Sequence, residues 1–151
     1  MLKRTDNKVF LARFMTTGAK QNFYEEITGT DVALAEHFCV SPEYGYVFYS
    51  VGSKVYEYDF SLKKSVLMKD YGNRRISVMK FHRFLSLEAA ISNAFYTELS
   101  RKLAICTYEP GNPSASGVME LYNVPGINGP LRLYKSYEGL GKVVSLTYRE
   151  R

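Results

Sequence analysis

The sequence predicts an all-β fold made of consecutive four-stranded antiparallel units, a partial β-propeller with one inserted helix near 86–99. Its composition, with 13 Tyr, 9 Phe and no Trp, favours pleated, half-buried surfaces. Short segments with alternating apolar residues are bounded by turn formers. These segments recur in a fixed order, and a four-stranded repeat of about 40–45 residues is typical of propeller blades. A plain antiparallel sandwich or small barrel is the alternative architecture.

Four types of predicted strand, named A to D, follow one another along the chain. Strand A carries alternating apolar residues and ends near an aromatic residue, and its copies are 33–41, 75–83 and 142–149. Strand B is predicted at 44–51 and 102–108, with a truncated copy at 1–4. Strand C is predicted at 8–15, 54–60 and 117–124, and the more polar strand D at 22–28, 65–72 and 131–139. The order is therefore B-C-D, A-B-C-D, A-B-C-D and a final A.

The turns between strands B and C contain residues that favour turn conformations. "TDNK" at 5–8 and "VGSK" at 51–54 supply Asp, Asn, Gly or Ser. The third connection, "YEPGNPSASG" at 108–117, is longer and carries two prolines. We therefore expect a projecting loop there.

The final strand, Lys142–Arg149, has no strand B, C or D after it, whereas the first unit has no strand A. We expect this strand to complete the first unit, because closure removes an exposed sheet edge. Three blades are fewer than the ~4–8 of propellers. The sequence thus predicts either an open arc or a homo-oligomer formed through Lys142–Arg149. We expect residues 1–151 to be one propeller-like domain, the C-terminal fragment of a longer protein.

The insertion at 84–101 separates strands A and B of the last unit. Its apolar residues recur at helical spacing and Ser86 is a suitable N-cap, so we expect a helix over 86–99. One interpretation is an amphipathic helix packed on the outside of the sheet. The other makes Phe95 and Tyr96 part of a contact surface for another subunit or domain.

Length, charge and hydropathy narrow the class of protein. The 151 residues, 46% of them hydrophobic, suit a single folded domain. The net charge of +5 comes from scattered basic residues without the clustered face of a nucleic-acid-binding protein. No apolar run reaches the ~18 residues of a membrane span. The opening "MLKRTDNK" lacks the apolar core of a signal peptide, so we expect a soluble chain.

Residues that could bind a metal are few. Cys39 and Cys106 lie in predicted strands and are interpreted as small buried hydrophobic residues, with a disulfide between them left open. His37 precedes the strand-A aromatic residue and His82 follows it, and we expect the two histidines to face opposite sides of their sheets. The sequence therefore predicts no metal site and no cofactor.

Carboxylates and tyrosines suggest two further chemistries. Glu25 and Glu26 are neighbours in a strand and point to opposite faces, whereas an acid/base pair needs carboxyl groups about 5–9 Å apart. The tyrosines of "YGYVFY" (44–49) and "YEYD" (56–59) could form a platform for sugar stacking. We favour packing between units, with the hydroxyl groups reaching backbone or solvent. No catalytic residue is predicted.

Four stretches resemble a known family: "YVFYSVGSKVYEYD", "ISVMKF", "KLAICTYEPGNPSASGVMELYNV" and the terminal "YEGLGKVVSLTYR". Together they are similar to the C-terminal part of the PKD-like family of Bacteroidetes lipoproteins, over about residues 2–149. The resemblance implies a longer protein with a lipoprotein signal, an immunoglobulin-like PKD segment and propeller-like repeats. It also implies a location at the cell surface or in the periplasm, and it brings no catalytic motif.

Two functional classes follow from these observations. The favoured class is a non-catalytic binding or scaffolding module at the surface of a Bacteroidetes-type cell, with a protein or glycan ligand. The alternative is a propeller-type carbohydrate-active hydrolase or lyase, with acidic residues gathered at one end of the blades.

Overall fold

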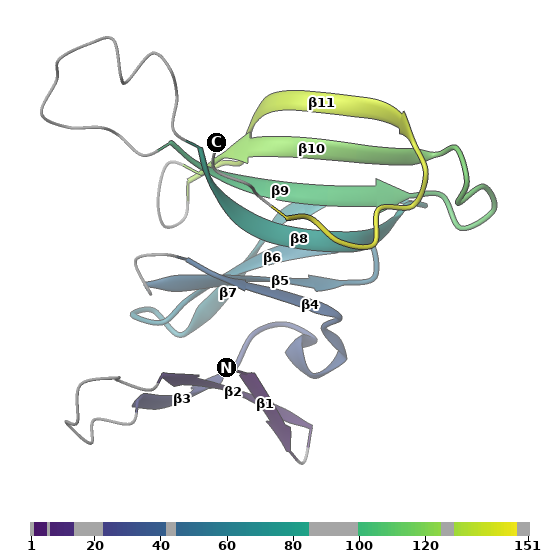
Figure 1. The fold of residues 1–151 in the computed structure, drawn as a ribbon. Coiled ribbons are helices and arrows are strands. Elements are labelled where there is room, and N and C mark those ends of the chain that lie inside the picture. The colour runs from purple at the N-terminus through teal and green to yellow at the C-terminus, as the bar shows by residue number, and fades with distance from the viewer. Residues whose placement is uncertain are drawn as a thin grey trace, which may run out of the picture.

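The computed structural model describes residues 2–5, 7–13, 23–41, 45–84, 100–124 and 129–147. Within these residues, eleven strands form three antiparallel sheets of three, four and four strands (Figure 1). The predicted all-β fold class is therefore confirmed.

Each sheet is a meander of consecutive strands. The first sheet contains β1 (Leu2–Thr5), β2 (Lys8–Arg13) and β3 (Phe23–Ile27). The second contains β4 (His37–Val40), β5 (Tyr46–Val51), β6 (Lys54–Asp59) and β7 (Lys64–Asp70). The third contains β8 (Arg75–Phe84), β9 (Ser100–Tyr108), β10 (Gly117–Asn123) and β11 (Arg132–Leu140). All eleven fall on predicted segments, which confirms the B-C-D, A-B-C-D, A-B-C-D order.

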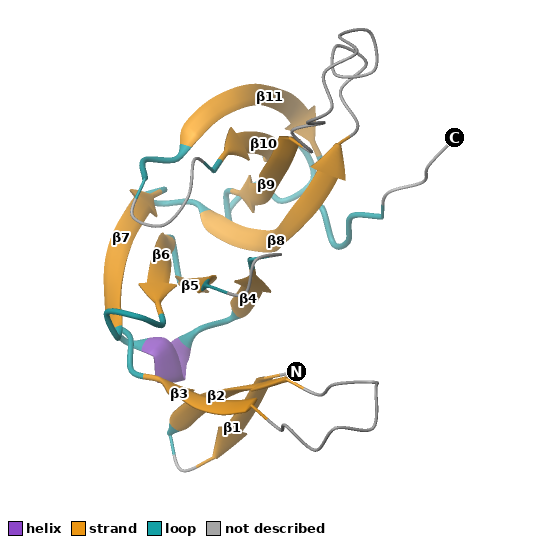
Figure 2. Cartoon of the chain, turned by 90° about the vertical axis from the view of Figure 1, so that its left-hand side faces the viewer, coloured by secondary structure: helices purple, strands orange, loops and turns teal. Residues whose placement is uncertain are grey.

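The second sheet lies between the other two (Figures 1 and 2). Along β5, Val47 and Tyr49 belong to a core cluster shared with the first sheet. The alternate residues Tyr46 and Phe48 belong to a second cluster shared with the third sheet. Because successive strand residues point to opposite faces, both faces of β5 are buried, and these four side chains are at most 4% exposed.

The first strands of the second and third sheets contact each other. His37 Nε2 on β4 lies 3.2 Å from the Ile76 carbonyl oxygen of β8. The Phe81 backbone N–H donates to the sulfur of Cys39, 2.9 Å away. Side chains of β4 thereby satisfy backbone groups at the edge of β8, which would otherwise be unpaired.

The predicted strand at 33–41 is shorter than expected. Val32–Leu34 form a 3-10 turn, and strand pairing begins at His37. Asp31 adopts a left-handed conformation with φ of 50°, which turns the chain before the strand starts. Val32 and Ala35 are buried in the first core cluster, so packing between sheets overrides the apolar alternation here.

The prediction of a terminal strand at Lys142–Arg149 is wrong over 142–147. These residues follow β11 without any strand pairing. The Lys142 amide donates to the Pro113 carbonyl at 2.7 Å, and Lys80 Nζ on β8 donates to the Leu146 carbonyl at 3.0 Å. The segment thus returns beside the third sheet (Figure 1). Loop and side-chain groups hold its backbone, so it does not complete the first sheet.

Some predictions fall on other parts of the chain. The helix at 86–99, including Phe95 and Tyr96, and residues 148–149 of the terminal strand lie outside the described residues. Among the described residues the three sheets form no closed ring. The structure therefore establishes stacked antiparallel meanders, and propeller closure is not part of it.

Candidate functional site

Three turns meet at one end of the second and third sheets. In an antiparallel meander every second connection emerges at the same end, which here gathers the β5–β6, β7–β8 and β9–β10 connections. They border an open depression with a volume of about 550 Å³. We call it the turn-end depression, and its lining residues are Asp31, Val51, Gly52, Ser53, Lys54, Tyr56, Gly72, Asn73, Arg74, Arg75 and Pro110.

The β7–β8 turn is built around the carboxylate of Asp70. One carboxylate oxygen accepts hydrogen bonds from Ser53 Oγ and from the Gly72 amide, both at 2.9 Å. The Gly72 hydrogen bond, followed by the Ser53 hydrogen bond, lowers the pKa of Asp70. Gly72 has a φ of 63°, which is favourable for glycine. This arrangement joins the β5–β6 and β7–β8 turns and uses Asp70 as a structural acceptor.

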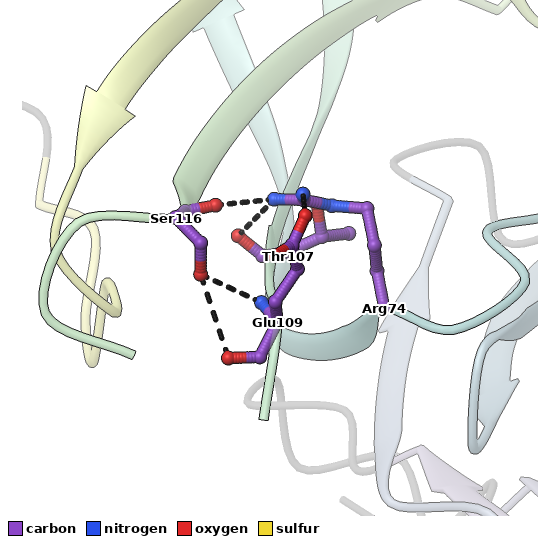
Figure 3. Close-up of polar contacts among 4 residues, drawn as sticks. All are labelled: Arg74, Thr107, Glu109 and Ser116. Carbon is purple, nitrogen blue, oxygen red and sulfur yellow. Dashed lines mark hydrogen bonds and ion pairs between the residues drawn. The ribbon is translucent and has the colours of Figure 1, made fainter. Parts of the chain in front are cut away.

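Arg74 holds the β9–β10 loop against the β7–β8 turn (Figure 3). Its Nε donates to Thr107 Oγ1 at 2.9 Å, and one Nη donates to the carbonyls of Thr107 at 3.3 Å and Ser116 at 2.5 Å. The other Nη donates to the Glu109 carboxylate at 3.2 Å. A guanidinium presents its donors in a rigid fork, so Arg74 fixes both ends of the loop.

The loop itself is closed by a second set of hydrogen bonds. Ser116 Oγ accepts from the Glu109 amide at 2.8 Å. The amides of Asn112 and Ser116 donate to the carbonyls of Glu109 and Asn112, at 3.0 and 3.1 Å. Residues 109–115 are exposed, which agrees with the predicted projecting loop.

Two cationic side chains remain accessible in the turn-end depression. Arg75 lies 3.8 Å from the Glu36 carboxylate, and the two side chains are 53% and 49% exposed. Lys54 is exposed and forms no ion pair with any described residue. Asp31 is the only carboxylate among the described lining residues. Lys54 and Arg75 are therefore the accessible cations of the lining, and the exposed carboxylates of Asp70 and Glu36 lie beside them.

The described lining of the depression contains neither a converging pair of carboxylates nor a cluster of metal-ligating residues. No group of three His, Cys, Asp or Glu residues within the described part of the chain could hold a metal ion. The lining residues in this part also include no histidine or cysteine. A single carboxylate cannot provide the converging pair used in glycoside hydrolysis.

The two cysteines predicted to be buried are both buried and free, so no disulfide joins them. Burial raises the pKa of the Cys39 thiol to about 12 and that of Cys106 to about 11. A thiol with a raised pKa is a poor nucleophile and metal ligand at neutral pH. Both residues therefore serve packing, as the sequence predicted.

The predicted histidine and carboxylate candidates are not brought together. His37 contacts the β8 backbone, and His82 lies in β8. In the β2–β3 register, Glu25 is opposite Leu11 and Glu26 is opposite Phe10, so the two carboxylates face opposite sides as expected. Glu26 lies 3.5 Å from Lys8 Nζ.

The tyrosines of the second sheet pack between sheets and provide no exposed platform. Tyr46, Tyr49, Tyr56 and Tyr58 are at most 8% exposed. Tyr49 and Tyr56 stack with ring centroids 5.2 Å apart, and Tyr49 OH donates to the Thr30 carbonyl at 2.9 Å. For these four tyrosines the interpretation of packing is thus confirmed, with the Tyr49 hydroxyl reaching the backbone, and sugar stacking on their rings is excluded. Tyr44 lies outside the described residues.

Sequence reasoning did not find the turn-end depression. In the sequence Arg74 and Arg75 are two of the scattered basic residues, and Lys54 ends the predicted turn at 51–54. The signal that could have found them was the strand order itself. Turns B–C and D–A of one unit lie at the same end of a meander, so their basic residues meet although 20 positions separate Lys54 from Arg74.

No helix in the part of the chain that the structure describes is long and apolar enough to cross a bilayer. No protein-family model, curated protein or solved structure matches the chain.

Proposed function

We propose that the chain is a non-catalytic binding or scaffolding module whose recognition surface is the turn-end depression. The observation that carries this proposal is the contrast between the two parts of the molecule. Both thiols and the tyrosines Tyr46, Tyr49, Tyr56 and Tyr58 are buried, whereas the exposed Lys54 and Arg75 border an open depression without a catalytic constellation. Loops placed on a rigid scaffold are the usual position of binding residues.

We further propose that the three sheets are successive blades of a partial β-propeller. The arrangement that supports this is the contact between β4 and β8, the first strands of their sheets. The last strand, β11, is exposed along almost its whole length. Sheets that stack face to face with their first strands together are arranged as propeller blades are around their axis. Small-angle scattering of the protein would test this, because a flat sandwich and an arc of blades differ in shape.

The sequence resemblance supports a role in a longer lipoprotein of the PKD-like family, at the cell surface or in the periplasm. The test is the fractionation of cells that express the natural gene. An antibody against the chain should detect a larger protein in the membrane fraction. Detection of a 17.3 kDa protein in the cytoplasm would contradict this part of the proposal.

A carbohydrate-active hydrolase or lyase is less well supported. Carboxylates do lie around the turn end, but Glu36 and Glu109 are paired with arginines and Asp70 accepts two structural hydrogen bonds. Incubation with a glycan and peptide array, followed by mass spectrometry of the supernatant, separates the classes. Binding without released product supports the module, released product supports the enzyme, and the absence of both contradicts the two hypotheses.

A further inference from the structure

We infer that the turn-end depression binds an acidic peptide segment, with Lys54 and Arg75 recognising its carboxylates. This inference rests on the proposed binding function and specifies the chemistry of the ligand.

The three cations of the lining differ in how firmly the protein itself binds them, and this difference is the first observation behind the inference. Arg74 makes three hydrogen bonds to Thr107 and Ser116 as well as an ion pair to Glu109. Its guanidinium is committed to the loop. Lys54 interacts electrostatically with the exposed Asp70 carboxylate, and Arg75 lies beside Glu36. Neither makes a set of hydrogen bonds to described residues like that of Arg74, so they are the cations that a ligand can engage.

The pair between Arg75 and Glu36 does not block such an interaction. Its atoms are 3.8 Å apart and both side chains are about half exposed. An exposed pair of this kind contributes little to stability. A ligand carboxylate can therefore replace Glu36 and bind the guanidinium in a bidentate manner, while Lys54 supplies a second point charge at the same depression.

The remaining lining residues favour a peptide over a glycan. The aromatic ring in the lining belongs to Tyr56, which is 8% exposed and stacked on Tyr49, so its face is closed to a sugar. The exposed amide of Asn73 offers donors and an acceptor for a peptide backbone. The exposed Pro110 adds an apolar contact.

Carboxylates around the depression limit the charge density of the ligand. Asp31 belongs to the lining, Glu109 and Glu36 stand beside the arginines, and the exposed Asp70 carboxylate interacts with Lys54. These groups repel a dense polyanion such as a nucleic acid. A segment in which acidic residues alternate with neutral ones fits two accessible cations better.

The test is fluorescence anisotropy with a labelled (Glu-Gly)4 peptide at low salt. Its comparison probes are (Gln-Gly)4 and an oligogalacturonate with four carboxylates. The test variant is Lys54→Gln/Arg75→Gln, and the matched control is Lys64→Gln/Arg132→Gln. The control removes the same charge from exposed residues at the opposite end of β7 and β11. Circular dichroism and the melting temperature show whether each variant is folded.

We expect the acidic peptide to bind more tightly than (Gln-Gly)4 and the oligogalacturonate. The test variant should weaken binding of the acidic peptide about tenfold, and the control less than about twofold. Equal weakening by both variants, preference for the oligogalacturonate, or no binding of the acidic peptide would overturn the inference. If the acidic peptide does not bind but another ligand on the glycan and peptide array does, the inference fails and the proposed binding function is retained. If no ligand on the array binds, the inference and the proposed function are both contradicted.

Discussion

Replacing Arg74 with alanine removes the contacts that fasten the β9–β10 loop to the β7–β8 turn. The side chain is 23% exposed, and its loss leaves the Thr107 and Ser116 carbonyls without their charged donor. Hydrogen bonds to charged groups contribute about 1.5–3 kcal/mol each at most, and the partly exposed ion pair to Glu109 adds about 0.5 kcal/mol. Because water can replace some of these donors, we expect the free energy of unfolding to fall by about 3 kcal/mol.

Differential scanning calorimetry of Arg74→Ala measures the expected fall in melting temperature. A loss of this size lowers the melting temperature of a 150-residue domain by about 6–12 °C. Hydrogen exchange should also become faster at the amides of Asn112 and Ser116, which bond within the loop. Arg132→Ala is the control, because this exposed side chain at the start of β11 should change stability by no more than about 0.5 kcal/mol. A melting temperature and loop exchange unchanged in Arg74→Ala would refute the role of Arg74.

Two further predictions concern buried groups. The folded-state pKa values of Cys39 and Cys106, about 12 and about 11, are raised above those of the unfolded chain. The contribution of these thiols to the free energy of unfolding is therefore complete below pH ~8.5. It is lost as the pH rises toward their folded-state pKa values. Denaturant titrations between pH 8 and pH 11 should show this fall in stability. Iodoacetamide at pH 8 should label the two thiols only after unfolding, and rapid labelling of the native protein would contradict their burial. Gly29→Ala should destabilise the protein by about 1–3 kcal/mol, because an added Cβ would lie 2.5 Å from the Tyr49 hydroxyl oxygen; a neutral effect in urea titration would show that this contact relaxes.

The strand order could be predicted because local pattern and turn chemistry agree in this chain. Gly52, between β5 and β6, has a φ of 60°, the conformation that makes glycine favourable in tight hairpins. The flanking residues alternate correctly, although Tyr46 and Tyr49 face opposite cores. Alternation could not tell which face was buried, since both faces are buried.

The terminal segment shows the limit of the same reasoning. Residues 142–147 have the alternating pattern of the other A strands, yet they form no strand pairing with any described residue. A strand needs the backbone of a partner as well as a suitable pattern. That partner is a property of the whole fold, so the pattern of Val143 and its neighbours predicts a strand that the structure does not contain. The turn-end depression was missed for a related reason, because its residues come from separate turns.

The architecture also supports the proposal that the turn-end depression is the binding surface. The facing surfaces of the sheets are filled by the two core clusters, and the edge of β8 is satisfied by β4. β7 and β11, the last strands of the second and third sheets, carry features that disfavour pairing with another strand. β11 carries Lys135 near its centre, and β7 and β11 pair with their neighbours through registers that contain shifts. Charged residues and bulges are the usual protection of exposed edges. Because the facing surfaces are filled, the turns are one place where the described chain can vary its chemistry without disturbing its core, and Lys54 and Arg75 stand there.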